Sequence, residues 1–293
     1  MADYRGVLAN YLGGGEATSK TPDGRWIRNK TVLSLAGFEV EILQHPGLIA
    51  KPTLKYRGQF VHTTDVIFRN VPEKKVRFVN RAISDVAQML SFAAVSPVRF
   101  FAYEYPTGSK RGSRWSTYGV LNTVCPVIPI HDSAAVREFL TQSWAAYRRE
   151  KARRRLPVVF DLLWLPEQPT HPIESRLLLL VTALETLKHT YAVQAGLRFN
   201  NGRFRSASGR PYSFRELLTK MLRAQGMRRG LKQLVGLRNQ VVHEGLPNRR
   251  FEAKRRMYRK CHDLIREYLL RLLEYSGPWM SFEKLAVRQL RLR

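Results

Sequence analysis

The sequence predicts an α+β protein with a mixed α/β part over residues 1–130 and an all-α helical part over residues 131–293. Short, partly alternating apolar runs occur in the first half, whereas apolar residues at helical spacing dominate the second half. Hydrophobic residues make up 44% of the 293 positions, which is enough to build a core. At roughly 100–200 residues per domain, the length favours two domains.

In the first part, alternation predicts strands, and one longer stretch, 76–95, has apolar residues at helical spacing and ends before Pro97. The segment 107–116 is polar and contains glycine, which indicates an exposed loop or hairpin. Gly13, Gly14 and Gly15 follow no predicted strand and precede no Lys-Ser/Thr pair, so a flexible terminus is favoured over a phosphate-binding loop. The predicted strands are 32–43, 63–69, 97–104 and 117–124.

The second part is expected to form an antiparallel helical bundle. Asp132 or Ser133 can cap its first helix, which runs to about Lys151. A proline-bearing segment, 156–172, then separates this helix from the next, and a basic loop with NNGR and SASGRP follows the second helix. The remaining predicted helices are 173–192, 213–225, 228–244 and 250–275.

The charge balance points to a polyanionic partner. Fifty Lys and Arg residues stand against 23 Asp and Glu, giving a formal net charge of +27, so nucleic acid is the first candidate and an anionic membrane surface the second. Cys125 and Cys261 cannot build a disulfide framework or a cysteine-based zinc module. The longest apolar run, 177–184, is too short to span a bilayer, and the N-terminus lacks a secretory signal. We therefore expect a soluble cytoplasmic protein.

The segment 228–247 carries the most chemical information. At 100° per residue, Arg238 falls in the middle of the apolar face of this predicted helix, where a charge needs a partner. Asn239 and His243 are i, i+4 neighbours on the adjoining face. His243 lies near the helix end marked by Gly245, where an imidazole can exchange protons near neutral pH.

Other ionisable residues have weaker signals. Glu185 lies at the edge of the apolar stripe of its helix. Three roles are open to it: a charge partner of Arg238, an active-site carboxylate, or a solvated residue beside His189. The remaining histidines show no ligand spacing, so no metal site is expected; they include His45, His62, His131 and His171. Basic clusters lie on both sides of Arg238 and His243 in the sequence and are expected to bind nucleic-acid phosphates: Arg228, Arg229, Lys232, Arg249, Arg250, Lys254, Arg255 and Arg256.

The spacing Arg238-Asn239-x-x-x-His243, with a preceding Leu-x-x-Leu and a following Gly, resembles the active motif of HEPN-domain proteins. Residues 174–191 resemble an earlier helix of the same domain. Residues 85–105 are similar to the segment that precedes this domain in ApeA-like abortive-infection proteins.

This resemblance implies a metal-independent, cofactor-free endoribonuclease that acts as a toxin or anti-phage defence effector. It also implies a homodimer formed through the helical domain, with two Arg/His motifs facing one cleft. The part over 1–130 is then expected to regulate the nuclease part, either by sensing a phage- or host-derived trigger or by restraining the nuclease until that trigger is present.

The expected chemistry uses the RNA 2′-OH as nucleophile, so catalysis needs proton transfer and stabilisation of a phosphorane. His243 would move protons, Arg238 would hold the phosphate, and Asn239 would orient the imidazole or donate to phosphate. The competing interpretation is a non-catalytic RNA- or DNA-binding protein with a HEPN-like bundle. Catalysis predicts that Arg238 and His243 approach one open cleft, whereas binding alone predicts a packed His243 or an Arg238 locked by a Glu.

Overall fold

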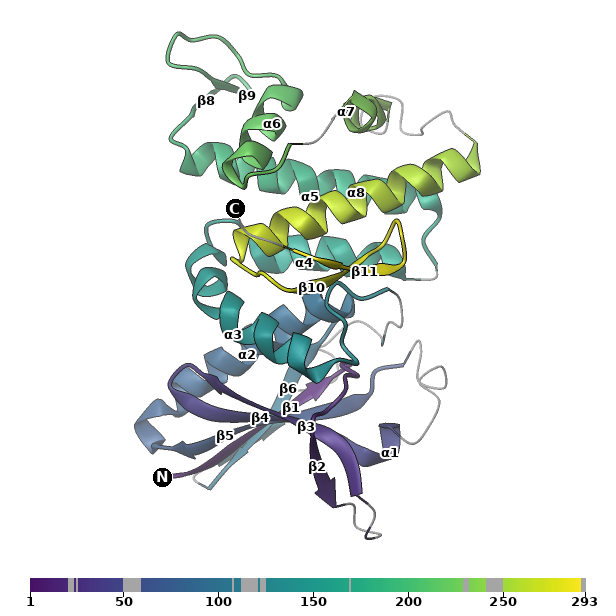
Figure 1. Ribbon diagram of the computed structural model, residues 1–293. Coiled ribbons are helices and arrows are strands. Elements are labelled where there is room, and N and C mark those ends of the chain that lie inside the picture. The colour runs from purple at the N-terminus through teal and green to yellow at the C-terminus, as the bar shows by residue number, and fades with distance from the viewer. Residues whose placement is uncertain are drawn as a thin grey trace. The chain divides into compact units, whose positions relative to one another are not determined.

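The computed structural model describes residues 1–20, 24, 26–49, 59–106, 108–111, 121, 125–168, 170–228, 232–240 and 250–290. It is a mixed α+β structure with a large antiparallel sheet and a helical part (Figure 1). The chain divides into two compact units. The first comprises Met1–Trp144, Gly277–Met280 and Ala286–Gln289, and the second comprises Ala145–Ser276, Ser281–Leu285 and Leu290–Arg293. This division falls inside a helix, whereas the sequence predicts a domain boundary between residues 130 and 131.

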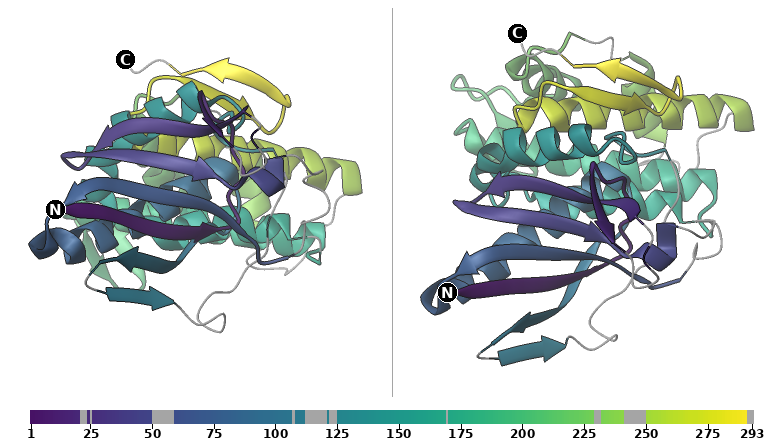
Figure 2. Two further views of the ribbon diagram at one scale, coloured as in Figure 1. Left: turned by 90° about the horizontal axis from the view of Figure 1, so that it is seen from below. Right: turned by 60° about the horizontal axis from the view of Figure 1, so that its bottom comes forward.

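A seven-stranded sheet of order β2-β3-β4-β5-β1-β6-β7 forms the first unit, and its described pairings are antiparallel (Figure 2). β1 lies between β5 and β6. This order places a strand from the very start of the described chain inside the sheet. The strands are β1 (Ala2–Ala9), β2 (Ala17–Lys20), β3 (Trp26–Leu35), β4 (Phe38–Gln44), β5 (His62–Val71), β6 (Arg99–Tyr105) and β7 (Gly108–Arg111).

The strands expected at 63–69 and 97–104 are confirmed as β5 and β6. The single strand expected at 32–43 is wrong, because the chain turns back at Ala36 and Gly37 and pairs Leu35 with Phe38. Both turn residues have positive φ, 57° and 81°, as a tight hairpin of this kind requires. β7 pairs with β6, which confirms a hairpin in the polar segment after Tyr105. The strand expected at 117–124 lies outside the described residues, apart from Leu121.

The glycine run is held against its surroundings, so the flexible terminus expected there is wrong. Gly14 N donates to Ile130 O at 2.8 Å. A Cβ added at Gly14 would lie 2.3 Å from the carbonyl oxygen of His131, and one at Gly15 would lie 2.3 Å from Lys30 N. These positions accept only glycine because another stretch of backbone approaches each of them.

One face of the sheet is covered by α2 (Val76–Ala94), which packs against β1, β5 and β6 and matches the helix expected at 76–95. Gly6 allows this close approach, because a Cβ there would lie 2.5 Å from Ile83 Cδ1. The next helix is α3 (Ser133–Glu150). Asp132 caps it as expected, since its carboxylate accepts hydrogen bonds from the backbone N–H groups of Ala134 and Ala135 at 3.0 and 3.3 Å.

The other face of the sheet carries charged side chains. Arg5 alternates with Gly6 along β1, so it points away from α2. Its guanidinium lies 2.7 Å from Asp65 and 3.2 Å from Glu104, which links β1 to β5 and β6. Arg69 on β5 pairs with Glu41 on β4 at 2.7 Å. This face is therefore a network of ion pairs between neighbouring strands.

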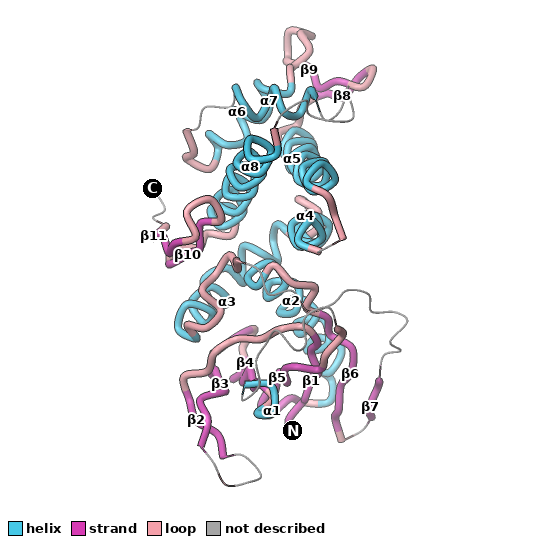
Figure 3. The backbone as a smooth tube through the Cα atoms, turned by 90° about the vertical axis from the view of Figure 1, so that its right-hand side faces the viewer, coloured by secondary structure: helices cyan, strands magenta, loops and turns pink. Residues whose placement is uncertain are grey.

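Within the second unit, α5 packs against α4, α6 and α8, and α7 packs against α8 (Figure 3). The helices expected at 173–192, 213–225 and 250–275 are confirmed as α5, α6 and α8. The helix expected at 228–244 is described in part, as α7. The helices are α4 (Leu156–Trp164), α5 (Ile173–Gln194), α6 (Phe214–Ala224), α7 (Lys232–Asn239) and α8 (Phe251–Leu272).

Two segments expected to be irregular form regular structure. The proline-bearing segment contains α4, because Pro157 falls in the first turn, where its missing N–H costs no helical hydrogen bond. It also contains a 3₁₀ turn, η4 (Leu165–Glu167). The basic loop contains a hairpin of β8 (Arg198–Asn200) and β9 (Arg203–Arg205). A second unexpected hairpin pairs β10 (Pro278–Ser281) with β11 (Ala286–Gln289).

A buried polar group lies on α8. His262 is fully buried, its Nδ1 accepts a hydrogen bond from Arg266 Nε at 2.9 Å, and its ring stacks on Phe282 at 4.8 Å. Glu167 lies 3.8 Å from His262 Nε2 and accepts a hydrogen bond from Tyr258. Burial, followed by the charge of Arg266, holds the pKa of His262 well below 6.5, and burial raises the pKa of Glu167.

Candidate active site

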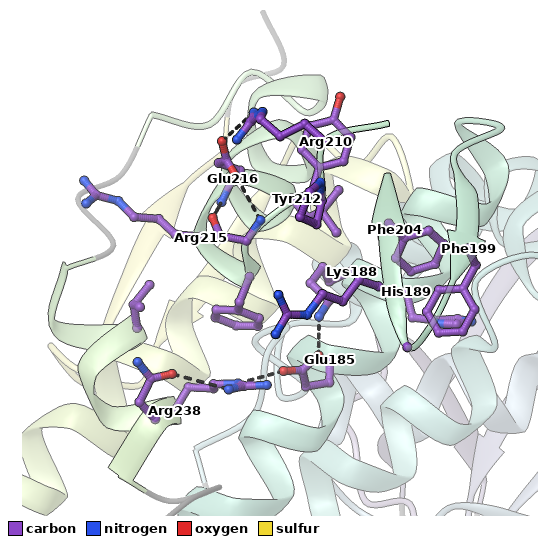
Figure 4. Close-up of a pocket in the computed structure, with 18 residues that line it drawn as sticks. Glu185, Lys188, His189, Phe199, Phe204, Arg210, Tyr212, Arg215, Glu216 and Arg238 are labelled. Carbon is purple, nitrogen blue, oxygen red and sulfur yellow. Dashed lines mark hydrogen bonds and ion pairs between the residues drawn. The ribbon is translucent and has the colours of Figure 1, made fainter. Parts of the chain in front are cut away.

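Arg238 on α7 and Glu185 on α5 form the centre of the candidate site. Arg238 Nε donates a hydrogen bond to Glu185 Oε1 at 2.9 Å (Figure 4). The two side chains are 22% and 30% exposed. A guanidinium in the middle of an apolar helix face is thus paired rather than left alone, as its cost of desolvation requires. Glu185 is therefore a charge partner of Arg238, as one of its alternatives proposed, and its role as an active-site carboxylate stays a prediction.

One aromatic ring contacts both of the cations that pair with Glu185. The guanidinium of Arg238 lies over the ring of Phe214, 5.2 Å from its centroid. Lys188 lies over the same ring at 4.9 Å and also pairs with Glu185. One carboxylate therefore sits between two cations, and both cations rest on one ring, which holds their side chains in place.

Asn239 is exposed next to this cluster, and its side-chain oxygen accepts a hydrogen bond from Arg238 Nη1 at 3.3 Å. This contact orients the amide relative to the guanidinium. His243, the third residue of the expected motif, lies outside the described residues, so the structure places two of the three.

A cavity of about 770 Å³ opens beside Arg238. Its described lining holds five cationic side chains against two acidic ones, so the net charge of this lining is positive. It also holds four aromatic rings besides that of His189. The charged side chains are Lys188, Arg203, Arg210, Arg215, Arg238, Glu185 and Glu216, and the aromatic ones are Phe199, Phe204, Tyr212 and Phe214.

The β8–β9 hairpin supplies the aromatic wall (Figure 4). Phe199 and Phe204 have ring centroids 4.8 Å apart, and the ring of His189 on α5 lies 5.1 Å from that of Phe204. Phe204 is buried, whereas Phe199 is 56% exposed. The hairpin therefore presents one ring anchored in the protein and one open to solvent, on which a planar group can stack.

The first turn of α6 forms another wall. Ser213 caps the helix, accepting from Glu216 N at 3.2 Å while Glu216 accepts from Ser213 N at 2.8 Å. Arg210 pairs with Glu216 at 2.8 Å and lies over Tyr212 at 5.7 Å. The hydrogen bond from Arg210, followed by those from Ser213, lowers the pKa of Glu216 to about 2. This capping box positions Phe214, the ring beneath Arg238.

The predicted RNA-binding residues differ in their availability. Arg228, Arg250, Arg255 and Arg256 are exposed. Lys254 is different, because its ammonium pairs with Glu174 on α5 at 2.6 Å and its side chain is only 16% exposed. This contact ties α8 to α5, so we expect Lys254 to contribute less to phosphate binding than the exposed arginines do. Arg229 and Arg249, and the side chain of Lys232, lie outside the described residues.

Sequence reasoning missed two features that the fold assembles. The aromatic hairpin had a signal, since Asn201-Gly202 between two Arg-Phe pairs is typical of a tight hairpin turn, and both residues have positive φ. The second feature brings His45 and His62, two histidines without ligand spacing in the chain, together with Asp65. The pairing of β4 with β5 brings these residues together, and no local sequence pattern predicts the cluster.

A scan of protein-family models, a search of curated proteins and a search of solved structures each find no match to this chain. Across the described helices, none combines the length and apolar character needed to cross a membrane.

Proposed function

We propose that the chain is an endoribonuclease of the HEPN type that cleaves RNA through its own 2′-OH. The observation that carries this proposal is the position of Arg238, a guanidinium oriented by Glu185 at the edge of a cavity rich in cations and aromatic rings. Cations attract a phosphate backbone without regard to sequence, and rings stack on unpaired bases. Single-stranded RNA offers both groups.

In this mechanism Arg238 donates to the scissile phosphate and stabilises the negative charge that grows in the phosphorane. His243 takes the proton of the 2′-OH or gives one to the leaving 5′-oxygen, and Asn239 orients the imidazole or a phosphate oxygen. The products are a 2′,3′-cyclic phosphate and a 5′-hydroxyl. DNA lacks the 2′-OH and is not cut. None of these steps requires a metal ion.

One observation favours a second candidate, a non-catalytic RNA-binding protein. The ion pair between Arg238 and Glu185 is the arrangement expected when that arginine is structural. Both candidates use the same cavity for RNA, so they differ in turnover rather than in binding.

The experiment that separates them is incubation of the purified chain with end-labelled RNA in EDTA, with DNA of the same sequence as control. The proposal expects RNA fragments that end in cyclic phosphate, no DNA cleavage, and complete loss of activity in His243→Ala with RNA binding retained. Cleavage at the wild-type rate by His243→Ala contradicts the catalytic proposal. Tight binding by the wild type with no cleavage leaves the second candidate.

As a biological role we propose a toxin or anti-phage defence effector, controlled through the sheet-bearing first unit by a phage- or host-derived trigger. The active form in this proposal is a homodimer built through the helical unit. RNA is then the polyanion that accounts for the net charge of +27.

A further inference from the structure

The first unit contains a cluster of two imidazoles and a carboxylate that the proposed nuclease chemistry does not use. His45 follows β4, whereas His62 and Asp65 lie on β5. His62 Nε2 lies 3.2 Å from Asp65 Oδ1, and His45 Nε2 lies 3.5 Å from Asp65 Oδ2. All three ligand atoms lie within 4.8 Å of one another.

These distances fit a bound metal ion. Zinc binds imidazole nitrogen and carboxylate oxygen at about 2.0–2.2 Å, so two ligand atoms at a tetrahedral ion are about 3.4 Å apart. The separation of His62 Nε2 from Asp65 Oδ1, 3.2 Å, is close to that value, and one ligand atom from each of the three residues lies within 4.8 Å of the other two. An ion can therefore enter between the three atoms with small side-chain movements.

His45 supplies a second, independent observation. Its Nε2 is buried, directed at Asp65, and without a well-formed hydrogen bond among the described residues. A buried ring nitrogen of this kind is costly, and a metal ion is one way to satisfy it. The two histidine side chains are nevertheless about one-third exposed, 34% and 35%, which leaves a path from solvent.

The surroundings hold the carboxylate of Asp65 in place, because Asp65 is buried and contacts an arginine on the neighbouring strand β1. Arg5 lies 2.7 Å from Asp65 Oδ2, which leaves Oδ1 for an ion, and Arg5 also pairs with Glu104. Partners of this kind orient a ligating group from outside the coordination sphere.

From this geometry we infer that His45, His62 and Asp65 bind one divalent transition-metal ion of the zinc class. Two imidazoles and one carboxylate match that class, since hard ions such as Mg²⁺ prefer oxygen ligands. Three protein ligands leave at least one coordination position for water. This inference does not depend on the proposed nuclease activity.

The test uses the full chain, stripped with a chelator and then dialysed, with Zn²⁺ uptake measured by equilibrium dialysis and Co²⁺ added as a spectroscopic probe. We expect one high-affinity Zn²⁺ per chain and visible Co²⁺ absorption bands of low coordination number. His45→Ala and His62→Ala should each weaken Zn²⁺ binding tenfold or more. His131→Ala, which removes an exposed histidine elsewhere, is the matched control and should bind as the wild type does.

Equal Zn²⁺ affinity in the wild type, His45→Ala and His62→Ala would overturn the inference, as would no uptake by the wild type. If an alanine variant fails to fold by circular dichroism, wild-type NMR provides the decision. Zn²⁺ must then shift the ring resonances of His45 and His62 and leave that of His131 unchanged, and any other pattern contradicts the site.

Discussion

Glu185 and Arg238 are 53 residues apart in the chain, yet the carboxylate of one accepts a hydrogen bond from Nε of the other at 2.9 Å. This contact joins α5 to α7 and fixes the direction of the guanidinium. Because Lys188 also pairs with Glu185, removal of the carboxylate leaves two cations together over Phe214.

We expect Glu185→Ala and Arg238→Ala to couple by about 0.5–1 kcal/mol in a double-mutant cycle of unfolding free energies, because the pair is only partly buried.

Arg238→Ala should also lower kcat for RNA cleavage by roughly 10²–10³ with a smaller effect on affinity, as loss of one transition-state donor does. Arg238→Lys is the control, because it keeps the positive charge but lacks the planar guanidinium that can donate two parallel hydrogen bonds. Wild-type kcat in Arg238→Ala would remove this residue from the chemistry.

The exposed arginines of α8 should contribute to binding rather than to turnover. Changing Arg255 and Arg256 to Gln removes two cations that neutralise phosphates, so the slope of log K against log salt should fall by about 0.7–0.9 for each of them. Fluorescence anisotropy over a salt series measures this slope. Lys254→Gln is the matched control, since its partner is Glu174 and it should lower stability while leaving the slope unchanged. Equal slopes in all three proteins would make this face a solvated surface.

The capping box at Ser213 should affect the site beyond its effect on stability. Loss of a cap costs about 1 kcal/mol, so Ser213→Ala should lower the unfolding free energy by that amount and fray the turn that holds Phe214. Asp132→Ala removes a cap of α3, in the first unit, at comparable cost. Only Ser213→Ala should also weaken RNA binding. A similar loss of binding in both variants would mean that stability alone is being measured.

Burial of His262 should make stability depend on pH. Its pKa is low in the folded chain and close to 6.5 when unfolded, so below pH 6.5 the unfolded state binds a proton that the folded state does not. Stability contributed by neutral His262 is therefore present above pH 6.5 and is lost as the pH falls, at up to about 1.4 kcal/mol per pH unit.

Urea unfolding at pH 5, 6 and 7 tests this effect, with His262→Asn as the comparison, because an amide oxygen can still accept from Arg266. The variant should be less stable at pH 7, and its deficit should shrink on acidification. Glu167, whose raised pKa acts with the opposite sign, is present in both proteins and is shared in the comparison. If the difference in unfolding free energy between the wild type and His262→Asn stays constant from pH 7 to 5, the low pKa given to His262 is wrong.

Dimer formation should be sensitive to ionic strength. Each chain carries +27, so two helical units repel one another at low salt, and screening or RNA should favour association. Light scattering at micromolar concentration, with and without RNA, is expected to show a dimer under the conditions of activity. A fully active monomer would rule the dimer out.

Local patterns predicted those elements whose burial follows a regular period. The stretch 76–95 and the helix that begins at Ile173 carry apolar residues at helical spacing, which was sufficient to predict both helices, although residues 89–94 of α2 are buried on all sides. β1 was missed because its burial comes from two neighbouring strands that lie far along the chain. α4 was missed because Pro157 suggests a linker unless one knows that it stands in a first turn.

The candidate site was predictable in its residue types and less so in its geometry. The position of Arg238 on an apolar face already required a partner, and Glu185 was among the alternatives. The contact of Phe214 with two cations could not be predicted from the sequence, because it depends on where α6 begins. Contacts between elements of this kind arise from tertiary packing, which a helical wheel does not contain.

The hairpin of β10 and β11 has a consequence for the order in which the protein is made. Residues 277–280 belong to the first unit, where Met280 N donates to Val127 O at 2.7 Å, yet they leave the ribosome after α4 to α8 of the second. The first unit can therefore begin to fold during synthesis but acquires these contacts only after helices α4 to α8 of the second unit have been made. The same interleaving means that no single cut yields both units whole.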